Sequence, residues 1–242
     1  MNRYVFIAPT FNALLTCKKA ILSLAVQSFE NWHLIVIDDM STDGTELEIR
    51  NTFSFLGIYE RLTYIKNDKK LWEVENVLQG LKRCTPDDIV CRFDLDDYLT
   101  DANALEIIDM QYRSDQKLEA LWSSHRWFDE RGITNNNISG PMPDNADPYK
   151  YPWVSSHLKT FRKRVIDEVN DQNFRGQDGK YIRRAGDQAI YLPCLARAKK
   201  RMYLPVTMYA YRCDMNPQTF QTDDAKFQKT EADFLRTRGF VE

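Results

Sequence analysis

Three carboxylates, those of Asp94, Asp96 and Asp97, lie within four residues directly after the apolar run 89–93. Such a run is typical of the end of a buried strand, and open α/β sheets bind their ligands beyond the carboxyl ends of strands. Crowded anions are costly unless a cation neutralises them, so a hard divalent metal is the natural partner. The competing interpretation is a solvated acidic turn in front of a helix.

A second acidic pair, Asp38 and Asp39, follows the apolar run 34–37. If the strands are neighbours, the two clusters meet at one edge, where one can bind a metal and the other can accept hydrogen bonds from a base or ribose. This combination describes a site for a nucleoside diphosphate. Two glycine-rich motifs commonly bind phosphate, G-x-x-x-x-G-K-S/T and G-x-G-x-x-G, and the sequence contains neither. A metal must therefore do most of the phosphate neutralisation, with Lys69 or Lys70 helping.

The elements that must position these residues alternate between strand and helix. The continuous apolar run 34–37 is typical of a strand buried on both faces of a parallel sheet. Helical spacing of apolar residues, as at Val74, Val77 and Leu81, separates the strands. We predict strands at 4–8, 32–37, 62–65 and 89–93, and helices at 16–28, 45–55, 71–83 and 102–115. The expected fold is α/β, with a mostly parallel central sheet flanked by helices.

The second half of the chain has a less regular pattern. We predict a strand at 120–123, an irregular segment at 124–152, a helix at 187–195, a strand at 201–208 and a last helix at 222–238. A long irregular segment inside a compact domain is usually functional or mobile. No linker clearly divides the chain, so we expect residues 1–100 and 101–242 to be two halves of a single domain.

The composition excludes several classes of protein. With 43% hydrophobic and 28% charged residues the chain is an ordinary globular protein, and its net charge of −2 gives no broad footprint for nucleic acid. The five cysteines are widely spaced and form no C-x-x-C pair, which argues for a reducing compartment. No apolar stretch approaches the roughly 20 residues of a membrane helix. We therefore expect a soluble, cytoplasmic protein, with its oligomeric state left open.

Several motifs together resemble the pattern of glycosyltransferase family 2 on a GT-A (Rossmann-like) fold. In chain order they are Pro9-Thr10-Phe11-Asn12, Gln27-Ser28-Phe29, Asp38-Asp39-Met40-Ser41-Thr42-Asp43-Gly44-Thr45 and Asp94-Leu95-Asp96-Asp97. The segment 153–163 and the pair Gly186-Asp187 extend the resemblance over most of the chain. It implies an inverting, metal-dependent glycosyltransferase that moves a sugar from a nucleotide-diphosphate donor, usually a UDP-sugar, to a hydroxyl of a glycan.

The resemblance also implies roles for single residues in the base pocket. Pro9, Thr10 and Phe11 would line that pocket, with Phe11 stacking on the base. Asp39 would accept a hydrogen bond from a base N–H, usually of uracil, and Asp38 would support it.

Further roles concern the diphosphate and the reacting atoms. Lys69 or Lys70 would approach the base or the diphosphate. In the Asp94-Leu95-Asp96-Asp97 motif, Asp94 would face the ribose or the sugar, while Asp96 and Asp97 would hold Mn²⁺ or Mg²⁺. Asp187 would be the general base that deprotonates the acceptor hydroxyl, since inversion by one direct displacement needs a single base.

The sequence departs from the family pattern at two places. Val74-Glu75-Asn76 stands where many relatives have Ala-Arg-Asn, and Tyr211-Arg212-Cys213 is followed by Asp214 where many have His. Asp is itself a hard-metal ligand, so Asp214 is a candidate to complete the metal shell. His157 is the other candidate, for the metal or for the acceptor. For both residues a structural hydrogen-bonding role is the alternative.

Three other activities compete with this interpretation. A haloacid-dehalogenase-type phosphatase would need its Asp-x-Asp motif after the first strand, with Thr where Tyr98 stands, and we reject it. A sugar nucleotidyltransferase would need a glycine-rich, Arg-containing loop where the sequence has Ala8-Pro9-Thr10-Phe11. A GT-A-like domain that binds carbohydrate or a partner without turnover stays open.

Overall fold

The computed structural model describes residues 1–213 and 221–242. Its strands are β1 (Tyr4–Thr10), β2 (Trp32–Asp38), β3 (Leu62–Lys66), β4 (Ile89–Arg92), β5 (Tyr98–Leu99), β6 (Ala120–Asp129), β7 (Gly132–Ile133), β8 (Lys159–Arg162) and β9 (Arg201–Arg212). Its α-helices are α1 (Cys17–Ala25), α2 (Thr45–Phe55), α3 (Trp72–Leu81), α4 (Ala104–Ser114), α5 (Arg164–Asp167), α6 (Gly186–Arg197) and α7 (Asp223–Arg238), with short 3₁₀ helices at Tyr59–Arg61 and Asp171–Phe174. Within these described residues, every helix is too short or too polar to cross a membrane.

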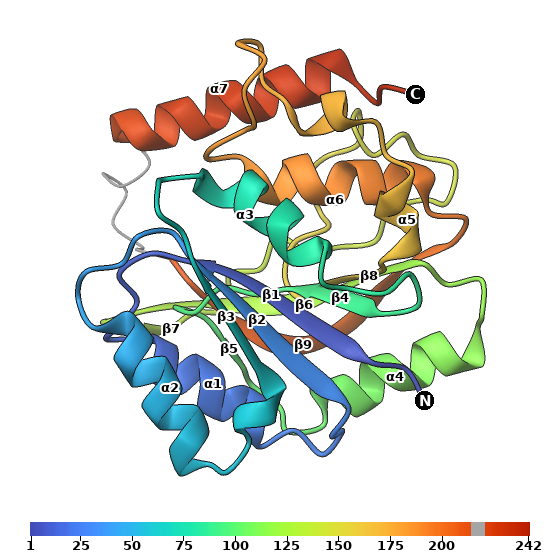
Figure 1. The fold of residues 1–242 in the computed structure, drawn as a ribbon. Coiled ribbons are helices and arrows are strands. Elements are labelled where there is room, and N and C mark those ends of the chain that lie inside the picture. Colours follow the sequence, from blue (N-terminus) through green and yellow to red (C-terminus); the bar gives the residue numbers. More distant parts are fainter. Residues whose placement is uncertain (214–220) are drawn as a thin grey trace.

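One sheet runs through the centre of the molecule in the order β3-β2-β1-β4-β8-β6-β9-β5, with β7 paired to β6 (Figure 1). Strands β3, β2, β1 and β4 are mutually parallel, so their carboxyl ends share one edge. β8 runs antiparallel between β4 and β6, and β9 is parallel to β6. The predicted α/β fold with its central sheet and flanking helices is confirmed.

Helices cover both faces of the sheet, and the alternation of side chains along β1 explains why. Tyr4 and Phe6 enter the hydrophobic core beneath α1, α2 and α4, whereas Val5 and Ile7 enter the core beneath α3 and α6. Successive side chains of a strand point to opposite faces, so a strand that is apolar at every position packs helices on both. Figure 1 shows α1, α2 and α4 on one side of the sheet and α3, α6 and α7 on the other.

The prediction of irregular chain over 124–152 is wrong at its start. β6 continues through Ser124 to Asp129 and turns back into β7, and β9 continues beyond the predicted residue 208 to Arg212. The two extensions pair with each other, with a register irregularity near Ser124. Their polar residues show no period-2 pattern, so strand formation here depends on pairing with a distant segment and not on local preference.

Gly80 lies where α3 packs most closely on the sheet. A Cβ there would lie 2.7 Å from Ile7 Cγ2 and 3.0 Å from Ile37 Cδ1, both in the core. We expect Gly80→Ala to lower the free energy of unfolding by about 1–2 kcal/mol, because overpacking outweighs the gain of roughly 1 kcal/mol in helix propensity.

Urea denaturation of both proteins measures this difference. Gly140→Ala is the matched control, since a Cβ at Gly140 meets only Val154 at 3.9 Å. A stabilised Gly80→Ala variant would contradict the close packing of α3.

Candidate functional site

The carboxyl ends of β1, β2, β3 and β4 border a polar cleft of about 800 Å³. Its walls come from both halves of the chain, since α3, β9, α7 and the segment before α6 all contribute. The lining residues are Pro9, Thr10, Phe11, Asp39, Lys70, Trp72, Glu73, Asn76, Arg92, Asp94, Asp96, Arg183, Arg184, Tyr211, Arg212, Asp224 and Gln228. The cleft therefore lies where ligands of open α/β sheets bind.

Asp38 is the last residue of β2 and Asp39 follows it, and the two carboxylates have different surroundings. Asp38 is fully buried and accepts hydrogen bonds from the Ser41 backbone N–H at 2.7 Å and from the Tyr64 hydroxyl at 2.6 Å. Asp39 accepts hydrogen bonds from the backbone N–H groups of Leu71 and Trp72, at 2.8 and 3.0 Å. Asp38 is thus a support beneath the cleft, while Asp39 both lines the cleft and caps the start of α3.

The environment of Asp39 favours its ionised form. Burial alone would raise the pKa of this carboxyl group, but the hydrogen bonds from Leu71, Asn67 and Trp72 outweigh burial and lower the pKa. The Asn67 side chain also donates to Asn76 Oδ1, which fixes the amide beside the carboxylate. Asp39 is therefore an anionic acceptor with a fixed orientation.

The aromatic ring of Phe11 is half exposed at the rim of the cleft, with a cation over it. The Lys70 ammonium lies 3.3 Å from the centroid of the ring and 3.7 Å from Asp39 Oδ2. Lys70 therefore lines the cleft beside Asp39, whereas Lys69 is exposed and does not line it.

The residues that follow Asp39 hold the loop after β1. Ser41 Oγ accepts from the Asn12 N–H, Thr45 Oγ1 accepts from the Ala13 N–H, and Asp43 accepts from the Leu14 N–H. Gly44 between them has φ +96°, a conformation that side chains disfavour. This part of the motif is therefore a clamp that shapes one wall of the cleft.

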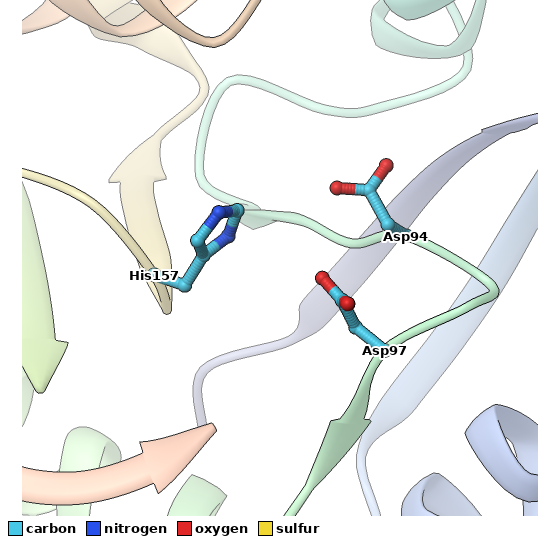
Figure 2. A group of neighbouring side chains, drawn as sticks. All are labelled: Asp94, Asp97 and His157. Atoms are coloured by element: carbon cyan, nitrogen blue, oxygen red, sulfur yellow. The ribbon is translucent and has the colours of Figure 1, made fainter. Parts of the chain in front are cut away.

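Asp94, Asp97 and His157 bring side-chain ligand atoms within 4.8 Å of one another. Figure 2 shows the imidazole and the two carboxylates turned toward a common space, with the aspartates on the connection that follows β4. Asp97 Oδ1 accepts from the Arg212 N–H at 2.6 Å, but the buried Oδ2 has no hydrogen-bond partner. Burial and the charges of Asp96 and Asp94 raise the pKa of Asp97.

This donor set fits a hard divalent cation. An orphaned buried oxygen, a neighbouring carboxylate and a neutral imidazole are ligands that Mn²⁺ and Mg²⁺ accept. His157 is neutral because burial and the nearby Lys159 ammonium lower its pKa well below the usual value. It is stacked between the rings of Tyr209 and Tyr211.

Two buried cations partly compensate the acidic residues. Arg92 lies 2.7 Å from Glu73 Oε1 and 2.8 Å from Asp94 Oδ1. Lys159, which is 1% exposed, lies 2.7 Å from Asp187 Oδ1. Burial and the charges of Asp187 and Asp94 raise the pKa of Glu73 to about 7, although Arg92 opposes this. Acidic groups still outnumber basic ones among these side chains, which favours a bound cation.

Asp187 stands at the start of α6, close to the cluster of Asp94, Asp97 and His157. Its Oδ2 lies 3.7 Å from His157 Nε2. Burial would raise its pKa, but the Lys159 ammonium, together with the Arg92 guanidinium, holds the pKa well below the usual range. Asp187 is therefore an ionised carboxylate whose side chain is one third exposed. The ring of His157 separates it from the carboxylates of Asp94 and Asp97.

The position of Asp187 depends on α7 and on a close helix contact. The carboxylate of Glu231 on α7 accepts from the N–H groups of Arg183, Arg184 and Ala185, which lead into α6. A Cβ at Gly186 would lie 2.2 Å from the carboxyl carbon of Glu73, so a side chain there would displace the carboxylate that pairs with Arg92. The close packing of the Glu73 side chain against Gly186 therefore explains why a glycine precedes Asp187.

Most of the predicted site residues lie in or beside one cleft. Pro9, Thr10, Phe11, Asp39, Lys70, Asp94 and Asp96 line the cleft directly, with Asp38, Asp97, His157 and Asp187 adjacent to these or to one another. Leu95 is buried beside it and lines the neighbouring cavity along the β1 loop. Asp214 lies outside the described residues.

Asp96 differs from its two acidic neighbours because it faces solvent. It lines the cleft. Partial desolvation by the surrounding protein, together with the charge of Asp94, raises its pKa to about 6. It is not one of the three residues whose ligand atoms converge.

The sequence interpretation missed Arg92, Glu73 and Lys159. A signal existed for Arg92, because a charged residue inside the apolar run 89–93 is unusual for a buried strand and needs a partner. Lys159 is the first residue of β8, a strand whose polar composition gave no sign that it lies in the middle of the sheet. No feature of the sequence around Glu73 indicated that this residue would lie in the site.

Comparison with known proteins identifies relatives of this arrangement. The family model "Glycosyl transferase family 2" matches residues 5–169. The chain is 24% identical over 227 residues to "Glycosyltransferase GlyA" of Streptococcus pneumoniae serotype 4; this match covers 87% of the chain but 30% of that protein. The chain therefore spans less than a third of the curated relative it matches.

Solved structures share the fold at low sequence identity. TarS 1–349 of S. aureus in complex with UDP superposes with a TM-score of 0.67 and 18% identity, over 95% of this chain and 65% of that one. The mannosyltransferase PcManGT of Pyrobaculum calidifontis in complex with GDP-Man and Mn²⁺ gives 0.63 and 14%, over 95% and 62%. These similarities support the GT-A fold assignment.

The Lys159–Asp187 pair should make stability depend on pH. Because the folded pKa of Asp187 lies below its unfolded value, the pair stabilises the fold above the unfolded pKa and loses this contribution as pH falls through the folded pKa. In Lys159→Met the remaining burial raises the pKa of Asp187, so the ionised carboxylate is penalised. We expect Lys159→Met to be destabilised by about 1–3 kcal/mol at neutral pH and by less near pH 4.

Urea denaturation at the two pH values measures this change. Lys229→Met, which breaks an exposed pair with Asp233, is the control and should change little at either pH. An equal loss for Lys159→Met at both pH values would argue against the charge interaction.

Proposed function

We propose that this chain, which belongs to glycosyltransferase family 2, transfers a sugar from a nucleotide-diphosphate donor to a hydroxyl group of a glycan, with inversion at the anomeric carbon. The observation that carries the proposal is the meeting of three groups at one cleft. These are a base-pocket acceptor at Asp39, a cation-binding set at Asp94, Asp97 and His157, and an ionised carboxylate at Asp187. Residues 1–100 supply most of the donor side, to which residues 101–242 add His157, and residues 101–242 also supply Asp187 and the acceptor side.

The donor side suits a UDP-sugar. Asp39 offers a fixed anionic acceptor, which pairs with the N–H donor on the Watson–Crick edge of uracil. Pro9, Thr10 and Phe11 line the same cleft, and a base that stacks on Phe11 would displace the Lys70 ammonium from the ring toward the phosphates. TarS with UDP, and TarS with UDP-GlcNAc at a TM-score of 0.67, give structural precedent.

A divalent cation would be held by Asp94, Asp97 and His157, with Asp96 facing the diphosphate from the solvent side. When bound, Mn²⁺ or Mg²⁺ supplies Lewis-acid stabilisation of the leaving diphosphate. Arg92 then keeps the Asp94 carboxylate in place through its 2.8 Å contact. PcManGT, whose structure contains Mn²⁺, is the relative that supports this proposal.

Asp187 acts as the general base in a single displacement. The acceptor oxygen attacks the anomeric carbon and gives its proton to Asp187, while the bond from that carbon to the diphosphate oxygen breaks and the nucleoside diphosphate leaves with the electron pair. Lys159 holds Oδ1, which leaves Oδ2 as the oxygen available to the acceptor. The low pKa keeps Asp187 ionised at neutral pH, as a base requires.

The metal assignment predicts the effect of two substitutions. Asp97→Asn and Asp96→Asn should each weaken Mn²⁺ binding in the presence of UDP by at least about tenfold, because each removes a negative charge that attracts the cation. Electron paramagnetic resonance of free Mn²⁺ measures the binding without any need for turnover.

Asp223→Asn, at an exposed residue at the start of α7, is the control. Unchanged Mn²⁺ affinity in Asp97→Asn would remove Asp97, and with it the cluster, from the metal site. Unchanged affinity in Asp96→Asn would remove only that residue.

If Asp187 is the base, substituting it should impair sugar transfer and leave donor binding intact. Asp187→Asn should bind UDP within about twofold of the wild type but lower kcat by roughly 10²–10⁴-fold, because the amide cannot take the proton. Calorimetric titration with UDP and a nucleotide-release assay with UDP- and GDP-sugars, Mn²⁺ and a panel of glycans measure the two effects. A near-normal rate in the variant would eliminate Asp187 as the base, and the exposed Asp233→Asn serves as the control.

A further inference from the structure

A second, smaller cavity of about 190 Å³ opens beside the donor cleft, and we call it the aromatic pocket. It is lined by His125, Trp127, Ile138, Trp153, Ser156, His157, Ala185, Asp187, Gln188, Tyr211, Gln228 and Ala232. Tyr211 and Gln228 line both cavities, so the two adjoin along these residues. The volume corresponds to roughly six water molecules in the liquid, which suits one small ring and not a bulky group.

The walls of the aromatic pocket are held in place by a network of neutral groups. Burial and the Lys159 charge lower the pKa of His125 to about 4, so its ring is uncharged. The Trp127 indole N–H donates to His125 Nε2 at 3.1 Å, which leaves the proton on Nδ1 to be donated to Ser139 Oγ at 3.2 Å. Trp127 is therefore a fixed aromatic wall, and Trp153 contributes a second indole.

The charge of the pocket restricts its occupant. Asp187 supplies a negative charge, and none of the lining residues in the described part of the chain is Lys or Arg. Residues 214–220 contain neither residue type in the sequence. The Lys159 ammonium is buried and already paired with Asp187. A phosphate or carboxylate placed here would meet the like charge of Asp187 and would find no lysine or arginine on the pocket lining with which to pair.

The polar atoms of the pocket favour hydroxyl groups. Gln188, next to Asp187 on α6, has a buried Oε1 atom without a hydrogen-bond partner. An unpaired buried acceptor is costly, and a ligand hydroxyl would satisfy it. Ser156 offers a further donor and acceptor at the wall. A ring with apolar C–H faces and hydroxyl edges matches both the indoles and these polar atoms.

We propose that the aromatic pocket binds the acceptor as an uncharged sugar ring and rejects phosphorylated or carboxylated sugars. The ring lies against Trp127 and Trp153 with one hydroxyl directed at Asp187. This inference rests on the proposed function, because it takes Asp187 as the base, and it adds the class of acceptor.

Tryptophan fluorescence titration tests the proposal without turnover. Methyl glycosides of glucose, galactose, mannose and N-acetylglucosamine are compared with glucuronic acid and glucose 6-phosphate, in the presence of UDP and Mn²⁺. We expect saturable binding of at least one neutral glycoside, with the charged sugars weaker by at least about tenfold. Trp127→Leu and Trp153→Leu should each weaken binding of the neutral glycoside by about tenfold. This affinity is measured by calorimetry, because each variant loses a fluorophore.

Several outcomes would overturn the proposal. These are equal or tighter binding of a charged sugar, no binding of any neutral glycoside, or unchanged affinity in both tryptophan variants. Phe55→Leu, at a highly exposed aromatic residue at the end of α2, controls for general effects of losing a ring. The same samples are titrated with UDP and GDP alone, and failure of both nucleotides to bind would count against the proposed function and not against the pocket.

Discussion

Charge compensation among buried side chains is the constraint on which the rest of the site depends. Glu73, Asp94, Asp97 and Asp187 come from three separate segments, and Arg92 and Lys159 are the buried cations that allow them to share one region. Each ion pair also joins elements: Arg92 links β4 to α3, and Lys159 links β8 to α6. Since a buried charge without a partner is strongly destabilising, these pairs fix the relative positions of the elements as well as their electrostatics.

The sheet explains why such a cluster can form at all. β8 is inserted between β4 and β6 and brings Lys159 and His157 next to the carboxyl end of β4. Asp94 and Asp187, which are far apart in sequence, become neighbours through this one short strand. On the proposed function, the remaining excess of acidic groups attracts the divalent cation, and that cation offsets the negative charge of the diphosphate.

Sequence patterns predicted the strand–helix alternation of the first hundred residues because apolar runs and helical spacing are local signals. The family resemblance added the positions of Asp39 and Asp187. β8 and the extended parts of β6 and β9 were not predictable in this way, since polar residues such as His125 and Lys159 enter strands only through pairing with distant partners. Compensating residues such as Glu73 acquire their role from neighbours that are remote in the chain, and no local pattern records them.

The contact between Glu231 and the backbone before α6 has a consequence for how the family similarity is used. The matched region ends at residue 169, yet Asp187 lies beyond it and is held in register by a carboxylate on α7. If Asp187 has the proposed role of base, the region matched by the family model and the catalytic unit have different boundaries in this chain. On the proposed roles, residues 5–169 placed on another scaffold would carry the donor side, and the recipient would have to supply both a carboxylate equivalent to Asp187 and a contact equivalent to that of Glu231.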